Sequence, residues 1–116
     1  MKKNVIKGLT LAALVVMPTM SMAEVFWKTG TVNRILIETG KYGGCMMQLP
    51  FNIGHDCASS WASFDCDGTY SDAGQGDRML NVALIAQTME KSVSIKIDNA
   101  KKHNGYCVIK RIDILK

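Results

Sequence analysis

The stretch that decides the fold runs from Asp77 to Asp98, DRMLNVALIAQTMEKSVSIKID, where a helical pattern is followed at once by a strand pattern. Apolar residues in its first part are spaced three or four apart, at Met79, Val82, Ala83 and Ala86, with Leu80, Leu84 and Ile85 widening the stripe. This spacing predicts one helix over residues 77–89. The second part alternates apolar and polar residues, which predicts a strand over residues 92–98.

Three strand patterns precede this helix, and one more follows the 92–98 strand. They cover residues 31–38 (TVNRILIE), 43–49 (GGCMMQL), 61–66 (WASFDC) and 106–115 (YCVIKRIDIL). Residues 24–30 are expected to be a short lead-in without regular structure. In the last strand the apolar alternation changes phase at Lys110 and Arg111, which predicts a β-bulge there.

The predicted order is therefore three strands, one helix and two strands, in a mainly β protein. A helix between the third and fourth of five strands is typical of the OB-fold barrel (β-β-β-α-β-β). Barrel closure would also remove the exposed strand edges of so small a sheet. The alternative is an open sheet with one helix packed across it. Residues 24–116 contain no repeat or linker, so we expect a single OB-like domain.

The first 23 residues have the pattern of a secretory signal peptide. Basic residues at the start (Lys2, Lys3 and Lys7) precede an apolar run over residues 9–17. Ser21 and Ala23 then place small residues at the two positions that a signal peptidase recognises, with cleavage expected before Glu24. The apolar run is too short for a stable membrane span, so no membrane insertion is expected after signal removal. The predicted destination is the periplasm or the medium.

The charge balance bears on one class of partner. Three of the chain's 14 basic residues lie in the predicted signal peptide, which leaves 11 against 10 acidic residues in the remaining 93. The near-neutral balance does not favour nucleic acid as a partner.

All four cysteines (Cys45, Cys57, Cys66 and Cys107) follow the predicted cleavage site. An even number in a small exported domain predicts two disulfides. No C-x-x-C pair is present, which argues against a zinc site or a redox pair. Antiparallel pairing of the second and third strands would place Cys45 opposite Cys66, leaving Cys57 for Cys107. The other two pairings, Cys57 with Cys66 and Cys45 with Cys107, or Cys45 with Cys57 and Cys66 with Cys107, remain open but less favoured.

Parts of this pattern resemble a known group of proteins. The resemblance rests on Cys57, Trp61–Phe64 and the segments LNVALIA (80–86), SVSIKI (92–97) and CVIKRI (107–112). Together they are similar to small exported OB-fold proteins of Gram-negative bacteria, among them the B subunits of AB toxins of the subtilase-cytotoxin kind. The resemblance implies a homo-oligomer, a pentamer in those toxins, that binds sialylated host glycans. No glycan-contacting residue of those proteins matches a position of this chain one for one.

No residue pattern indicates catalysis, and none indicates a cofactor. His55 and Asp56 lie near Ser59 and Ser60, but neighbours on one loop seldom reach triad geometry, and no nucleophile elbow is present. His103 is expected on the surface of a polar turn. The acidic residues Asp65, Asp67 and Asp72 lack the later bidentate Glu of a calcium loop, so no metal site is expected.

Aromatic residues are the better candidates for ligand recognition. Tyr42, Trp61 and Tyr70 lie in or beside the loops with which OB folds commonly bind ligands, and aromatic faces stack on sugar rings. Trp61 opens a strand, so a core position is the favoured interpretation for it, whereas Tyr42 lies at a glycine-flanked hairpin tip and is expected to be exposed. We therefore expect an exported, non-catalytic binding module whose partner is a glycan or a protein, similar to a toxin B subunit. The alternative is a monomeric periplasmic or cell-envelope accessory protein that binds another protein.

Overall fold

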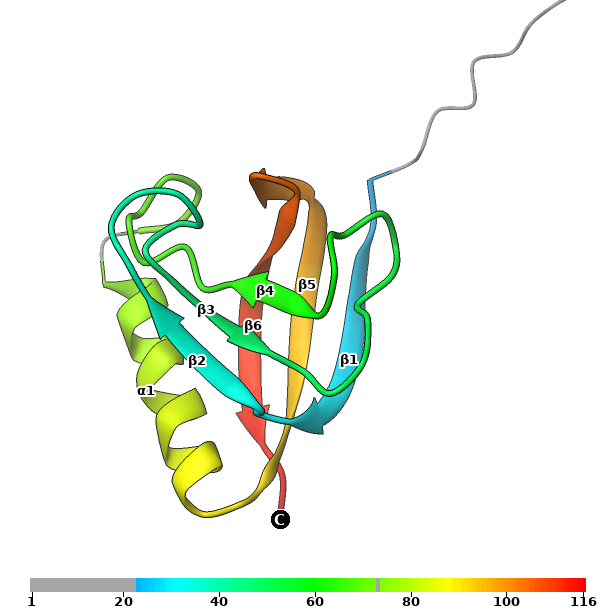
Figure 1. Cartoon of the computed structure of the whole chain (residues 1–116), viewed down its shortest axis with the longest axis vertical. Coiled ribbons are helices and arrows are strands. Elements are labelled where there is room, and N and C mark those ends of the chain that lie inside the picture. The colour runs from blue at the N-terminus through cyan, green and yellow to red at the C-terminus, as the bar shows by residue number, and fades with distance from the viewer. Residues whose placement is uncertain (1–22, 73) are drawn as a thin grey trace, which may run out of the picture.

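The computed structural model describes residues 23–72 and 74–116. The predicted signal peptide lies outside the described residues, apart from Ala23. The described chain forms one six-stranded sheet and one helix (Figure 1). In chain order the elements are β1 (Val25–Thr31), β2 (Arg34–Ile37), β3 (Cys45–Gln48), β4 (Trp61–Ser63), α1 (Gln75–Thr88), β5 (Ser92–His103) and β6 (Tyr106–Ile114).

The strands lie side by side in the order β1-β5-β6-β4-β3-β2. Neighbouring strands are antiparallel except β4 and β6, which are parallel and pair at Ser63 and Val108. The prediction of a mainly β protein with one helix is confirmed. The prediction of a closed five-stranded barrel is not, because the sheet has six strands and is open.

The sixth strand arises from a break in the predicted first one. Residues 31–38 were expected to be continuous, but β1 ends at Thr31 and β2 begins at Arg34. At this break Val32 is buried, and the backbone N–H of Asn33 donates to the Gln48 carbonyl at 2.9 Å. The chain thus changes partner here, from β5 to β3.

The expectation that residues 24–30 lack regular structure is wrong, because most of them form β1. This strand pairs with β5 over its whole length, from Val25 opposite Asp98 to Thr31 opposite Ser92. Phe26 faces the core and Trp27 faces solvent. The paired residues lie 61 to 73 positions apart in the chain, so no local sequence pattern predicts the pairing.

The predicted bulge in the last strand is confirmed. Lys96 pairs with Arg111, but the next residue, Ile97, pairs with Ile109, so Lys110 has no partner on β5. A second irregularity between Asp98 and Lys102 lets β5 continue to His103. The strand was expected to stop at residue 98, so its last five residues were missed.

Helix α1 packs against β6, β3 and β5 and covers one part of the core. Its buried residues include Met79, Leu80, Ala83 and Ala86, as the spacing predicts. Leu84 and Ile85, however, are 39% and 50% exposed. The helix meets only one side of the sheet, so the outer half of its apolar stripe has no covering element among the described residues.

The start of α1 lies very close to the chain that follows β4. A side-chain carbon added at Gly76 would come within 2.5 Å of the Phe64 carbonyl oxygen and 2.8 Å of the Cys66 Cα. Glycine is therefore required for this approach. The helix begins at Gln75, two residues before the predicted start.

Two disulfides connect the loops to the sheet. Cys45 is bonded to Cys66 and Cys57 to Cys107, with Cα–Cα distances of 5.7 and 5.5 Å. This is the favoured pairing, although the register differs by two residues: Met46 faces Ser63, so Cys66 lies diagonally from Cys45 instead of opposite it. Two disulfides and no free cysteine suit an oxidising, exported environment.

Among residues 23–72 and 74–116, no helix is long and apolar enough to cross a membrane.

Candidate functional site

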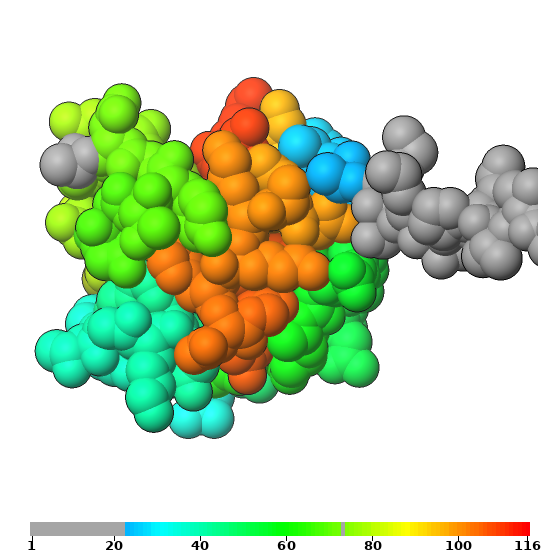
Figure 2. Space-filling view, turned by 90° about the horizontal axis from the view of Figure 1, so that it is seen from above, coloured from blue at the N-terminus to red at the C-terminus, as the bar shows by residue number. Residues whose placement is uncertain are grey.

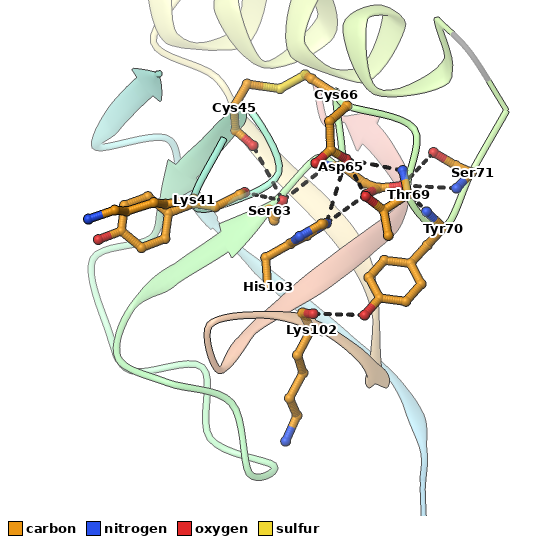
Figure 3. Close-up of polar contacts among 12 residues, drawn as sticks. Lys41, Cys45, Ser63, Asp65, Cys66, Thr69, Tyr70, Ser71, Lys102 and His103 are labelled. Carbon is orange, nitrogen blue, oxygen red and sulfur yellow. Dashed lines mark hydrogen bonds and ion pairs between the residues drawn. A yellow bond between two sulfur atoms is a disulfide. The ribbon is translucent and has the colours of Figure 1, made fainter. Parts of the chain in front are cut away.

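A buried histidine–aspartate contact lies at the end of the molecule where the loop before β3, the loop after β4 and the end of β5 meet. The His103 Nε2 atom is 2.6 Å from the Asp65 Oδ1 atom (Figure 3). The Asp65 side chain is fully buried, and the His103 side chain is nearly so. Asp65 follows β4 in a left-handed conformation (φ 58°), and His103 is the last residue of β5. The pair therefore connects the loop after β4 to the β5–β6 hairpin.

The second oxygen of the Asp65 carboxylate organises the loop over residues 67–72. It accepts hydrogen bonds from the backbone N–H groups of Tyr70 (2.8 Å) and Ser71 (2.9 Å). The Ser71 hydroxyl donates to the same oxygen at 2.9 Å. A buried carboxylate with this many donors is fully satisfied, so it fixes the loop instead of destabilising it.

These contacts also set the ionisation of Asp65. Burial by itself raises the pKa of the Asp65 carboxyl group, because it disfavours the charged form. The hydrogen bonds from His103, from the Tyr70 backbone and from Ser71 act in the opposite direction and outweigh burial. The net result is a pKa below the usual value, so Asp65 is ionised throughout the physiological range.

The loop over residues 39–44 closes this cluster from a third direction. The Ser63 hydroxyl donates to the Tyr42 carbonyl at 2.7 Å and accepts from the Asp65 backbone N–H at 3.0 Å. Gly43 has φ 81°, and an added Cβ would lie 2.5 Å from the Ser63 oxygen and 2.8 Å from the His103 ring. Glycine is thus needed for both the backbone conformation and the space. In Figure 2 the β5–β6 hairpin lies beside both this loop and the 67–72 loop.

A cleft of about 280 Å³ lies beside the cluster. The 67–72 loop, the start of α1 and the strands β5 and β6 line it with Tyr70, Ser71, Asp72, Gln75, Met79, Lys101, Val108, Ile109 and Lys110. The Tyr70 side chain is fixed at its edge: its hydroxyl donates to the Lys102 carbonyl at 2.8 Å, and its ring packs edge-on against His103. The Asp65–His103 pair therefore holds one wall of the cleft.

The three predicted ligand-binding aromatics lie in different surroundings. Tyr70 is 41% exposed and lines the cleft. Tyr42 is half-buried at the same end, with its ring edge-on to Tyr106 at 5.3 Å. Trp61 lies apart from both, on β4, with the Arg34 guanidinium 5.4 Å from its ring centre. The structure brings Tyr42 and Tyr70 to one end but leaves Trp61 outside that group.

One group of side chains has the composition of a metal site. The ligand atoms of Asp65, Asp67 and His103 all lie within 4.8 Å of one another. The Asp65–His103 contact is a hydrogen bond in length, and the Asp67 oxygen is 3.9 Å from the same nitrogen. A zinc ion, with bonds of about 2.0–2.2 Å to such ligands, would have to replace the shared proton and move these groups apart. The observed distances therefore fit a proton between His103 and Asp65.

The triad-like residues on the 51–60 loop do not come together. His55 contacts the Glu24 carboxylate at 3.0 Å, and Asp56 accepts from the Lys102 amine at 3.1 Å. The Ser60 hydroxyl accepts a hydrogen bond from Gln48. None of the hydrogen bonds found among the described residues joins His55 to a serine.

Sequence reasoning missed the central pair. His103 was expected on the surface of a turn, but the prolonged β5 carries it under the 67–72 loop. In the sequence Asp65 stands only among acidic residues that do not complete a calcium loop. The two residues are separated by 38 positions and meet only when β5, β6 and β4 are assembled, so no spacing in the sequence marks them.

Comparison with known protein families, with curated proteins and with solved structures finds no match to this chain.

Proposed function

We propose that this protein is an exported binding module that recognises a glycan through the cleft beside Tyr70. Export is supported by the signal-peptide pattern of residues 1–23 and by the two disulfides. The observation that carries the binding proposal is the cleft itself, in which an exposed aromatic ring, polar groups and two amines converge.

We further propose that the strand arrangement is of the OB type. Strands β1 and β2 follow each other in the chain and lie at opposite ends of the sheet order. Counted as two halves of one bent strand, they leave five strands with the helix between the third and the fourth. This order, and the parallel pairing of β4 with β6, support the OB proposal. The resemblance to toxin B subunits is in keeping with it.

The chemistry of the cleft suits a sugar that carries a negative charge. Ligand sites combine apolar walls with a few directed polar groups, and here Met79, Val108 and Ile109 supply the apolar wall. Lys110 is exposed at the β6 bulge. The Lys101 amine lies 4.0 Å from the Asp98 carboxylate, an ion-pair contact that is too long for a strong hydrogen bond.

A glycan array tests this proposal. The processed wild-type protein is expected to bind a subset of charged glycans, and Lys110→Ala is expected to weaken that binding. Loss of one charge-assisted hydrogen bond costs about 1.5–3 kcal/mol, or roughly tenfold to a hundredfold in Kd. Lys116→Ala is the matched control, since it removes the same charge outside the cleft, and should leave Kd unchanged. No binding across the array would contradict the glycan proposal.

A second candidate is a monomeric accessory protein of the cell envelope that binds another protein. It is favoured by the outer face of α1, where Leu84, Ile85 and Met89 are 39%, 50% and 58% exposed. Size-exclusion chromatography of the oxidised, processed chain separates the two candidates. A homo-oligomer supports the toxin-subunit type of binding module, and a monomer favours the accessory protein.

A further inference from the structure

Glu24, the residue expected to follow the signal-peptide cleavage site, is hydrogen-bonded to β5. The Glu24 backbone nitrogen donates to the Asn99 side-chain oxygen at 2.7 Å. In return, the Asn99 backbone N–H donates to the Glu24 carbonyl at 3.1 Å. Asn99 is only 9% exposed, whereas Ala23, on the other side of the expected cleavage site, is exposed.

His55 supports this contact from the 51–60 loop. Its Nδ1 atom lies 3.0 Å from the Glu24 carboxylate, and its ring stacks on Phe26 with centres 3.9 Å apart. The Asn99 amide group donates to the His55 carbonyl at 2.8 Å. The Asn99 side-chain amide thus donates through its nitrogen to the His55 carbonyl and accepts through its oxygen from the Glu24 nitrogen.

Cleavage changes the chemistry at this nitrogen. In the uncut chain it belongs to an amide with one hydrogen. Hydrolysis of the Ala23–Glu24 bond adds one water molecule, leaving a carboxylate on Ala23 and an ammonium group with three hydrogens on Glu24. A charged donor forms a stronger hydrogen bond to a carbonyl oxygen than a neutral amide does.

We propose that Asn99, held in place by His55, is a receiving site for the amino terminus that removal of residues 1–23 creates. The proposal rests on the export proposed above. The Asn99 side-chain oxygen accepts a hydrogen bond from the new ammonium group, and the nearby Glu24 carboxylate adds an opposite charge. Processing therefore strengthens the attachment of β1 to β5 at the point where the sheet begins.

The first experiment establishes where the processed chain starts. The full chain, residues 1–116, is exported from a bacterial host, and the mass of the intact product is measured. The expected mass is that of residues 24–116 with both disulfides formed. A start at any other residue contradicts the predicted cleavage site and overturns the receiving site with it.

The second experiment measures the reactivity of the α-amine. The exported protein is treated with a limiting amine-reactive ester near neutral pH, and modification of Glu24 is followed by peptide mass spectrometry. A hydrogen-bonded ammonium reacts slowly, so the wild-type rate should be several-fold below that of Asn99→Ala. Asn99→Asp keeps an acceptor oxygen and should stay slow. Asn81→Ala, on the exposed face of α1, is the control and should match the wild type.

If Asn99→Ala does not fold, the reactivity of the Glu24 amine is compared instead between the native and the urea-unfolded wild-type protein. The Glu24 amine should react several-fold faster in urea than in the native protein, after correction with a free peptide of the same sequence. A Glu24 start combined with equal native and unfolded rates, or with a fast Asn99→Asp variant, would overturn the receiving site. Export and glycan binding would be untouched by that result.

Discussion

At the scale of single residues, the candidate site depends on Asp65. One carboxylate holds His103 on the hairpin and two backbone N–H groups of the 67–72 loop. Removing one partner of a buried pair leaves the other unsatisfied, which costs more than the pair itself contributes. The Asp65 contacts fix the position of Tyr70, so they also connect this residue to the proposed binding cleft.

Asp65→Asn is expected to lower the free energy of unfolding by about 2–4 kcal/mol near pH 7. The amide keeps the shape but loses the charge that His103 and the loop donors stabilise. Urea denaturation measures the change. Asp67→Asn is the matched control in the same loop, and because its side chain is 35% exposed we expect a loss below about 1 kcal/mol. Equal losses would show that Asp65 has no special role.

The same substitution should change how stability depends on pH. Folding lowers the pKa of Asp65, so its contribution is complete above the pKa of the unfolded chain, about 3.9. It is lost as the pH falls through the still lower pKa of the native state. Between about pH 5 and pH 2 the wild type should therefore lose stability more steeply than Asp65→Asn. Parallel curves from urea denaturation at each pH would contradict this assignment.

At the scale of elements, helix α1 is placed by the close approach at Gly76. Alanine would normally favour a helix over glycine by about 1 kcal/mol. Here its Cβ would meet backbone atoms at 2.5 and 2.8 Å, and these cannot rotate away as the end of a side chain can. The steric clash therefore outweighs the higher helix propensity, so alanine at this position is expected to lower the free energy of unfolding.

We expect Gly76→Ala to destabilise the protein by about 1–3 kcal/mol, despite the higher helix propensity of alanine. Asn81→Ala tests propensity alone at an exposed position of the same helix and should stabilise by up to about 0.7 kcal/mol. Urea denaturation of both variants gives the comparison. A stabilised Gly76→Ala variant would mean that the helix shifts easily relative to the loop after β4.

The helix and the strands differ in how well the local sequence pattern predicts them. The helix and the Val93–Ile97 core of β5 were predicted because their periodicity is strong and their apolar faces point to one core. Strand β1 and the end of β5 were missed because their order comes from partners distant in the chain. The bulge at Lys110 was predicted because a change of phase is visible within one strand.

At the scale of the whole molecule, the two disulfides set the stability of a small chain. They close loops of 21 and 50 residues. In the chain-entropy model each contributes about 3–4 kcal/mol, with more from the longer loop. The net stability of a domain is about 5–15 kcal/mol, so the loss of either bond is a large fraction of the total.

Cys57→Ser is therefore expected to reduce the exported yield far more than His55→Ala. Replacing both Cys57 and Cys107 by serine should cost about 4 kcal/mol, and replacing Cys45 and Cys66 about 3 kcal/mol. Immunoblots of the exported fraction and urea denaturation of the purified variants provide the measurements. Equal yields for Cys57→Ser and His55→Ala would contradict the importance of this disulfide.

The amino-acid sequence by itself determined the class of this protein: mainly β, with one helix and four cysteines whose favoured pairing is the one observed. These features follow from periodicity and from the short chain paths between the strands. Only the tertiary structure decided that six strands form an open sheet, that His103 is buried against Asp65, and that Glu24 meets Asn99. Each of these depends on which distant segments come to lie side by side, and the burial and hydrogen bonding that stabilise them exist only after the sheet has assembled.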